Sequence, residues 1–440
     1  MLNHLKTVIS IFLLIVINDL RYFKNELNTS YFNLRMDCKM SEGPLKDIRI
    51  IDASSILMVP YCTRLLADMG AEVIKVETIE GDNTRFIGPA KNEGMAAVYL
   101  SINRNKKSIC IDIKSQEGQS IINKLIKTSD VFVSNIRKAA LKRIGLTHSN
   151  FIKINPKIIT ANAVGFSSKG AYAGLPAFDD TIQAVSGMAA FQEAYSSQPS
   201  YTAGATADKV TGLMLGMAII AALFKSTKSG KGSEIEVPMM ETMVDFTLVE
   251  HLYGYNFIPP KGPPIYPRQS SPNRRPFKTL DGYIAVMPYN DNQWLRFFKM
   301  INKEDILDNK KFSSLNARNE NIDLLYSLLS DELKKNTTNY WIDNLKKNDI
   351  PAMNVNTPES LFEDEHLKST QFFKVNSHPT EGKLLYTSFP VNFNEDDDSK
   401  TKHAPNLGEH TKDILYELGY TNTDLKKLAS EGVIKFKDKK

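Results

Sequence analysis

The segment IRIIDASSILMVPYCTRLLADMGAEVIKVE, residues 48–77, decides the fold class. It opens on a β-branched run at residues 48–52, which suits a buried strand. Residues 61–69 then place apolar side chains at helical spacing and stop at Gly70, and residues 71–77 form a second β-branched run. A strand, a helix and a strand in immediate succession predict a βαβ unit with parallel strands.

The same alternation continues along the chain. Further strands are predicted at residues 108–112, 131–133, 158–161 and 233–237, and further helices at residues 118–127 and 210–224. Because strands and helices keep alternating, we predict an α/β fold with an open, doubly wound parallel sheet.

The chain changes character at residues 258–276, which hold seven prolines and no hydrophobic periodicity. We therefore predict a large domain whose first part is residues 40–257, followed by a linker at residues 258–276. A smaller α+β domain is predicted at residues 277–375, and a closing segment with a helical pattern at residues 376–440.

Composition and charge narrow the class of protein. The 440 residues are 42% hydrophobic and 24% charged, which is typical of a soluble globular chain with two domains. We find no apolar stretch in the body of the chain that is long enough to cross a bilayer, so no membrane partner is expected there.

The formal charge of +5 comes from Lys and Arg scattered among acids, which argues against a nucleic-acid partner. Three cysteines without a CxxC pair, and seven histidines without HxxxH or HExxH spacing, indicate no metal site and a reducing, cytoplasmic setting.

Residues 1–39 differ from the rest of the chain. Residues 8–17 form an apolar run behind Lys6 that resembles the core of a signal peptide, yet no clear small-residue cleavage site follows. Three interpretations stay open: an upstream extension from a misplaced start codon, a membrane anchor or signal, and a buried helix. We favour the extension, because Met40 opens a stretch that looks like a natural beginning.

One acid stands out by its position. The P-loop, the GxSxG elbow and a GxGxxG motif after the first strand are all missing, whereas Asp208 precedes an unbroken apolar periodicity that starts at Val210. Asp is a favoured helix N-cap, which is a purely structural explanation. A carboxylate at a helix N-terminus is also expected to stay ionised beside the helix dipole, and it can then attack an activated acyl group. Gly212 and Gly216 lie four residues apart in the same helix, where they would let another backbone or a ligand approach closely.

Several runs of sequence together resemble one known family. They lie at residues 44–52, 65–77, 103–108, 130–131, 141–146, 165–166, 183–187, 230–232 and 404–411, with Asn135 and Asp179 between them. In this order, over residues 44–420, they resemble the class III CoA transferases, the CaiB/BaiF family. The resemblance implies an open, Rossmann-like large domain built from both chain ends, so that residues 376–440 return to it. It further implies a smaller inserted α+β domain and two subunits interlocked as rings in a homodimer.

The resemblance also implies a reaction. Asp208 falls on the family's catalytic aspartate, whose carboxylate attacks a donor thioester to give a mixed anhydride and then an aspartyl-CoA thioester. The implied substrates are an acyl-CoA, which is a coenzyme A thioester, and a small carboxylic acid, with no tightly bound cofactor and no metal. Basic side chains at the implied CoA contacts suit its phosphates. These contacts are Ile111, Lys114, Asn135, Arg137, Arg143, Phe178 and Asp179.

A few positions depart from the family pattern. Ile56 and Leu57 stand where the formyl-CoA transferase branch has a polar contact to the pantetheine arm. Thr78 stands where an Arg is common, and Arg85 is expected to compensate. Phe178 stands where the racemase branch has a His, so two-base proton exchange would lack one base. A 2-methylacyl-CoA racemase-like isomerase is therefore a disfavoured alternative, and an inactive CoA-binding protein is the second alternative.

Overall fold

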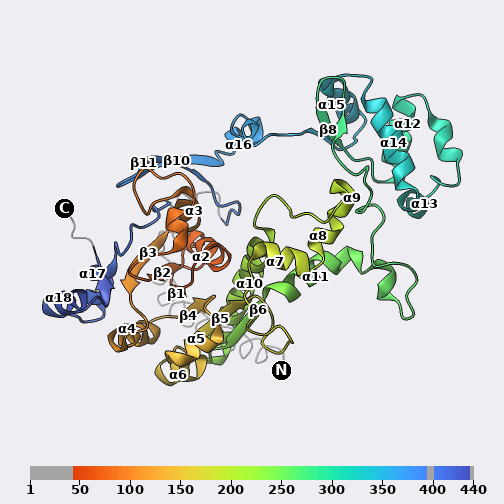
Figure 1. The fold of residues 1–440 in the computed structure, drawn as a ribbon. Coiled ribbons are helices and arrows are strands. Elements are labelled where there is room, and N and C mark those ends of the chain that lie inside the picture. The colour runs from red at the N-terminus through yellow and green to blue at the C-terminus, as the bar shows by residue number, and fades with distance from the viewer. Residues whose placement is uncertain (1–42, 394–400, 437–440) are drawn as a thin grey trace, which may run out of the picture.

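The computed structural model of the chain describes residues 43–393 and 401–436. The predicted extension at residues 1–39 lies outside the described residues. Figure 1 shows two bodies, a larger one that holds the main sheet and a smaller one made by the middle of the chain.

A seven-stranded sheet forms the centre of the large domain, with the strand order β12-β3-β2-β1-β4-β5-β6. All neighbours pair in parallel except β12, which runs antiparallel to β3. The central strands are buried on both faces, as their β-branched runs predict. The strands are β1 (Arg49–Ala53), β2 (Glu72–Glu77), β3 (Lys106–Ile111), β4 (Val131–Ser134), β5 (Ile159–Val164), β6 (Glu234–Pro238) and β12 (Ile434–Lys435). The predicted α/β class with a parallel sheet is confirmed.

Helices cover both faces of this sheet. On one face α2, α7, α10 and α11 contribute to an apolar core that includes Leu66, Leu215 and Met243, and on the other face α4, α6, α17 and α18 contribute to a second core around Phe151 and Leu425. The helices of the large domain are α2 (Met58–Asp68), η1 (Asn83–Phe86), α3 (Ala97–Ile102), α4 (Gln116–Lys127), α5 (Lys138–Arg143), α6 (His148–Ile154), α7 (Asp179–Val185), α8 (Met188–Phe191), α9 (Glu193–Ser196), α10 (Thr206–Ser229), α11 (Met239–His251), η2 (Tyr253–Asn256), α17 (Thr411–Glu417) and α18 (Asn422–Ser430). The sheet is therefore doubly wound.

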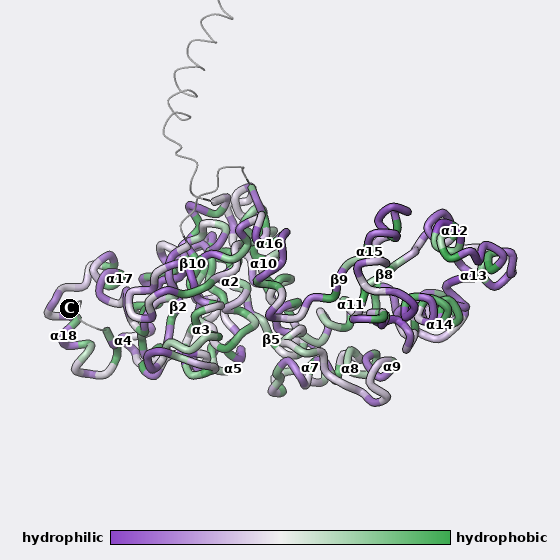
Figure 2. Tube along the Cα trace, turned by 90° about the horizontal axis from the view of Figure 1, so that it is seen from above, coloured by the Kyte–Doolittle hydropathy of each residue, from purple (hydrophilic) through white to green (hydrophobic). Residues whose placement is uncertain are grey.

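The small domain has a core of its own, built around Trp294, Phe297 and Leu329. It contains a three-stranded antiparallel sheet in the order β7-β8-β9. Figure 2 shows this domain standing apart from the large one when the molecule is seen from above. Its elements are β7 (Phe277–Lys278), β8 (Tyr283–Val286), α12 (Asp291–Met300), η3 (Glu304–Asp308), α13 (Leu315–Glu320), α14 (Ile322–Leu333), α15 (Thr338–Lys347) and β9 (Ala352–Asn354).

The chain then returns to the large domain. The elements on the way are η4 (Ser360–Phe362), α16 (Glu365–Ser369), β10 (Phe373–His378) and β11 (Gly382–Thr387). β10 and β11 form a hairpin-like pair beside the large domain, where Arg104 donates to the Thr387 carbonyl and Asn92 bonds Glu381. After that pair, α17 and α18 pack on the sheet and β12 pairs with β3, so both ends of the described chain build the large domain.

Helix α10 has two different sides. Ala207, Leu215 and Ile219 are buried in the core, whereas Met217 and Phe224 are each about 60% exposed. By length and composition alone this helix could span a membrane, so the expectation that no stretch was long enough is wrong for α10. One side of α10 packs against α2 and α11 in the core of the large domain. The other side is an apolar face that no described residue of the chain covers.

Candidate functional site

The strand order changes direction between β1 and β4. β3 and β2 lie to one side of β1, and β4, β5 and β6 follow on the other side. In open α/β sheets, ligands bind at the carboxyl ends of the strands at such a point. The two loops that leave β1 and β4 are joined there, because Ser55 N–H donates to Asn135 Oδ1 at 3.2 Å and Asn135 Nδ2 donates to the Ser55 carbonyl at 2.8 Å. The fold therefore places the candidate site at this edge.

The turn from β1 into α2 has an unusual backbone. Ile56 has φ 69°, in the left-handed region that β-branched residues seldom adopt. Its N–H donates to Asp82 Oδ1 at 3.3 Å, and Asp82 is itself paired with buried Lys75 at 2.8 Å. No side chain caps the first turn of α2, whose N-cap residue is Leu57. The buried charges thus support a strained turn directly at the edge of the sheet.

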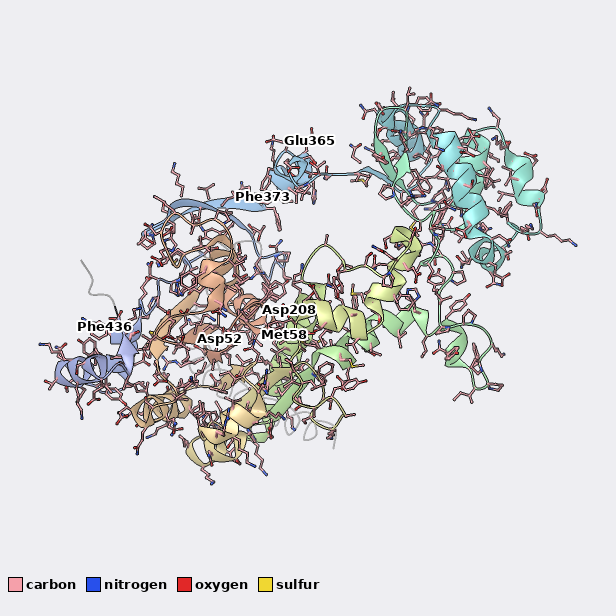
Figure 3. All side chains as sticks on the ribbon, viewed as in Figure 1. Asp52, Met58, Asp208, Glu365, Phe373 and Phe436 are labelled. Carbon is pink, nitrogen blue, oxygen red and sulfur yellow. The ribbon has the colours of Figure 1, made fainter. Side chains whose placement is uncertain are left out.

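Asp208 lies in the first turn of α10. The purely structural explanation, in which Asp208 is the N-cap, is wrong, because the helix starts at Thr206, Ala205 is the N-cap, and no side chain caps the end. One turn later, a Cβ on Gly212 would stand 2.7 Å from the Met58 carbonyl oxygen, so Gly212 allows α10 to touch the start of α2. Figure 3 shows Asp208 and Met58 close together where these helices meet.

Gly216 makes a looser contact than Gly212. A Cβ there would meet only the Cys62 Sγ, at 3.6 Å, which is an ordinary van der Waals distance. The predicted close approach of another backbone is thus confirmed at Gly212, whereas Gly216 makes only an ordinary contact. The tight contact holds α10, one turn after Asp208, against the start of α2.

The electrostatic surroundings of Asp208 differ from the prediction. Burial raises the pKa of its carboxyl to about 7, and the negative charge of Asp179 adds to this effect. The Asp208 N–H donates to Asp179 Oδ1 at 2.9 Å, so the two acids are neighbours. We had expected the helix dipole to keep this carboxylate ionised, but partial burial and a nearby like charge outweigh the dipole. Asp208 therefore titrates near neutral pH, as groups that exchange protons or act as nucleophiles often do.

The predicted CoA contacts fall into two groups. Lys114 and Asn135 follow the carboxyl ends of β3 and β4, and Arg137 comes two residues after Asn135, so these three share the edge at which Ser55 meets Asn135. Lys114, Arg137 and Arg143 are exposed and can reach a phosphate. Ile111 is different, because its side chain is fully buried in the core beneath α17 and α18, and we assign it no side-chain contact.

Phe178 and Asp179 mark the start of α7. Phe178 is 68% exposed and its backbone is the N-cap position of the helix, whereas Asp179 is half-buried and faces Asp208. The structure thus brings Asp179 next to the candidate nucleophile and leaves the Phe178 ring open to a ligand or partner.

Arg85 cannot compensate for Thr78, contrary to the expectation. Its guanidinium donates to both oxygens of Glu77, at 2.8 and 2.7 Å, and stacks over the Tyr99 ring at 3.8 Å. The side chain is almost fully buried, so it is not available to a phosphate. Buried ion pairs of this kind lie below the carboxyl edge of β1, β2 and β3, and sequence patterns gave no sign that these charges pair with one another.

Among residues 43–393 and 401–436, no three His, Cys, Asp or Glu side chains come together as metal ligands. Cys62 is fully buried, and burial raises the pKa of its thiol well above the usual range. It is therefore a poor nucleophile. Asp208, in contrast, has a pKa near neutral and lies in the first turn of a helix, which suits it to covalent chemistry.

Comparison with known proteins adds an independent line of observation. Residues 45–411 match the sequence model described as CoA-transferase family III. The chain is 28% identical over 405 residues to (R)-2-hydroxy-4-methylpentanoate CoA-transferase of Clostridioides difficile, covering 89% of this chain and all of that protein. It is 31% identical over 401 residues to human succinyl-CoA:glutarate CoA-transferase, covering 89% and 90%. A CaiB/BaiF family protein from Brucella suis superposes with a TM-score of 0.71 at 28% identity, over 86% of this chain and all of that one.

Proposed function

The chain belongs to CoA-transferase family III, and on that premise we propose that it moves coenzyme A from an acyl-CoA donor to a carboxylic acid acceptor through covalent steps on Asp208. The observation that carries the proposal is the Asp208 carboxyl itself. It stands in the first turn of α10, one turn before the contact of Gly212 with the start of α2, partly buried, with its pKa raised to about 7 by burial and by Asp179. A carboxylate of raised basicity is a better nucleophile once it is ionised.

The proposed cycle balances without any additional reagent. An Asp208 oxygen attacks the thioester carbonyl of the donor, the carbon–sulfur bond breaks, and a mixed anhydride and CoA thiolate result. The thiolate then attacks the Asp208 carbonyl carbon, which releases the donor acid as a carboxylate and leaves an aspartyl-CoA thioester. The acceptor carboxylate attacks that thioester and releases the thiolate again. In the last step the thiolate takes the acceptor acyl group and frees the Asp208 carboxylate.

Exposed cations support binding of the CoA end of the substrate. Lys114 and Arg137 at the edge of the sheet, and Arg143 at the end of α5, offer donors to phosphates, and Asn135 is already oriented by its two bonds to Ser55. The named relatives act on carboxylic acids as different as a branched 2-hydroxy acid and glutarate. We therefore propose only that the acceptor is a small carboxylic acid, without naming a particular one.

The test is a transfer assay on the purified chain, with several acyl-CoA donors crossed with several acids and the products read by mass spectrometry. We expect a new acyl-CoA to appear only when both a donor and an acceptor are present. Deuterium entering the α-carbon of a 2-methylacyl-CoA without transfer would instead support the racemase alternative. CoA binding without any turnover across the panel would contradict the proposal and support an inactive binding protein.

We further propose that two copies of the chain form a homodimer through the uncovered side of α10 and α11. These helices pack against each other and present neighbouring apolar side chains to the outside. A groove of about 580 Å³ runs along α11 between Met240 and Leu252. The exposed apolar side chains are Leu213, Met217, Ile220, Phe224, Phe246, Val249 and Leu252. So many exposed apolar side chains on two neighbouring helices are uncommon on a monomer and are typical of a protein interface.

Light scattering coupled to size exclusion should give twice the mass of one chain. The dimer should persist on dilution into the low micromolar range, because a large apolar face favours a stable association. A mass equal to one chain at micromolar concentration would contradict the dimer and would leave the α10 and α11 face to another partner.

A further inference from the structure

Gln183 is a fully buried amide that takes no direct part in the transfer steps. It lies on α7, one turn after Asp179, and it joins this helix to residues 202–204. Its Nε2 donates to Asp179 Oδ2 at 2.5 Å and to the Gly204 carbonyl at 3.4 Å. Its Oε1 accepts from the Thr202 N–H at 3.0 Å and from the Thr202 hydroxyl at 3.1 Å. The amide thus connects α7 to the loop that leads into α10.

The backbone fixes which way this amide points. The Thr202 N–H can only donate and the Gly204 carbonyl can only accept, so a flipped amide would face a donor with its nitrogen and an acceptor with its oxygen. Nε2 must therefore point toward Asp179. The other oxygen of Asp179 already accepts the Asp208 N–H at 2.9 Å. Both oxygens of Asp179 are thus used as acceptors, which is the arrangement of an ionised carboxylate.

This chain of hydrogen bonds ends at the nucleophile. Asp179 receives the N–H of Asp208, and the Thr202 hydroxyl bonds the hydroxyl of Thr206, which is the first residue of α10. The first turn of α10 has no side-chain cap at Ala205, so the Asp179 carboxylate supplies an acceptor for one of the free backbone N–H groups of this turn, that of Asp208. The position of Asp208 therefore depends on Gln183 indirectly, through Asp179.

We propose that Gln183 is a positioning residue for the transfer reaction: it keeps Asp179 as a charged acceptor beneath the Asp208 N–H, and so fixes both the orientation of Asp208 and the negative charge beside it. The proposal rests on the proposed function, since it needs Asp208 to be the nucleophile. Its consequence is that the negative charge of Asp179 stays next to Asp208, where it adds to burial in raising the pKa of the Asp208 carboxyl. A raised pKa makes the Asp208 carboxylate more basic once it has lost its proton.

The charges around α10 are consistent with this assignment. Of the elements packed against α10, only α7 contributes a charge that shifts the pKa of Asp208, through Asp179; burial is the larger cause. Lys209 follows on α10 itself and is exposed. The other charged side chains on those elements are Asp180 on α7, Arg64 and Asp68 on α2, Glu241, Asp245 and Glu250 on α11, and Glu234 and Glu236 on β6.

The experiment compares pH profiles of kcat in wild type and in Gln183→Met, which has a similar size but no amide. In wild type the acid limb should have its midpoint at about 7, with activity rising as Asp208 loses its proton. In Gln183→Met we expect kcat to fall roughly 10- to 100-fold, because the carboxylate is misplaced, with KM for acyl-CoA within about threefold. The midpoint should move to lower pH, because the negative charge of Asp179, which raises the pKa of Asp208, is then no longer held beside it.

Two further variants make the result decisive. Asp179→Asn removes the charge but keeps an oxygen for the Asp208 N–H, so its midpoint should also move to lower pH, even if Gln183→Met does not fold. Ser186→Ala removes a buried hydroxyl one turn further along α7 and should keep the wild-type midpoint. A wild-type midpoint in both Gln183→Met and Asp179→Asn would overturn the positioning role. Absence of transfer in wild type would instead overturn the proposed function.

Discussion

Replacement of Asp208 by Asn should reduce CoA transfer by roughly three orders of magnitude or more, because loss of a covalent nucleophile typically has an effect of this size. The amide has the same shape and cannot form the anhydride. The fold should survive, and the variant should even be the more stable protein above neutral pH. Since the folded-state pKa of Asp208 is raised, ionising it costs stability progressively from about pH 4 to pH 7, and Asn removes that cost.

Covalent trapping locates the chemistry on one residue. With acyl-CoA present, hydroxylamine should convert wild-type Asp208 to a hydroxamate, and borohydride should reduce the aspartyl-CoA thioester to an alcohol at the same position. Asp180→Asn is the matched control, because Asp180 is an exposed acid next to Asp179 and should leave transfer within about twofold of wild type. Adducts found in peptide mass spectra on Asp179 or Glu241, with Asp208 unmodified, would show that Asp208 is not the nucleophile.

Replacement of Asp52 by Asn should destabilise the large domain by about 3–5 kcal/mol, the usual effect of removing one partner of a buried ion pair. Asp52 is fully buried and accepts from Lys106 Nζ at 3.1 Å and from the Thr63 hydroxyl at 2.6 Å. Burial alone would raise its pKa, but Lys106 and then Lys75 hold the pKa of this carboxyl below its usual value. Asn keeps the hydrogen bonds in part and leaves two buried ammonium groups with less negative charge.

Urea unfolding at several pH values measures this effect. Burial already lowers the pKa of Lys106 to about 8, and loss of Asp52 should lower it further. The variant should therefore recover stability as pH rises toward 10, because a buried lysine that has lost its proton costs less. Asp331→Asn, which breaks an exposed pair with Lys334, should change stability by at most about 0.5 kcal/mol. Equal effects of the two variants would mean that the Asp52 cluster contributes no more than a surface pair.

The sheet and the helix that carries Asp208 were predictable, because both depend on local patterns. The β-branched run at residues 48–52 and the apolar helix predicted at residues 210–224 appear in the structure as β1 and α10, within about five residues of the predicted bounds. A strand, a helix and a parallel strand have few ways to pack, so residue spacing alone fixes this part of the fold.

What could not be predicted depends on pairing between distant residues. The burial of Arg85 against Glu77 and the raised pKa of Asp208 beside Asp179 both need the tertiary structure. Gln183 gave no signal in the sequence beyond a family motif, because a buried amide becomes informative only when its fixed donors and acceptors are known. The short strand β12, two residues long, has no pattern that periodicity can detect.

The pairing of β12 with β3 has a consequence for synthesis of the chain on the ribosome. Residues 434–435 pair with the last two residues of β3, and residues 402–410 bond the earlier part of its outer edge, whereas the other strands of the sheet lie within residues 49–238. Until residue 402 and those after it have been translated, the nascent sheet presents an open edge at Lys106–Ile111, and open edges recruit strands from other chains. Polysomes carrying neighbouring nascent chains are therefore a setting in which this protein is exposed to aggregation, and a premature stop before codon 402 would make that exposure permanent.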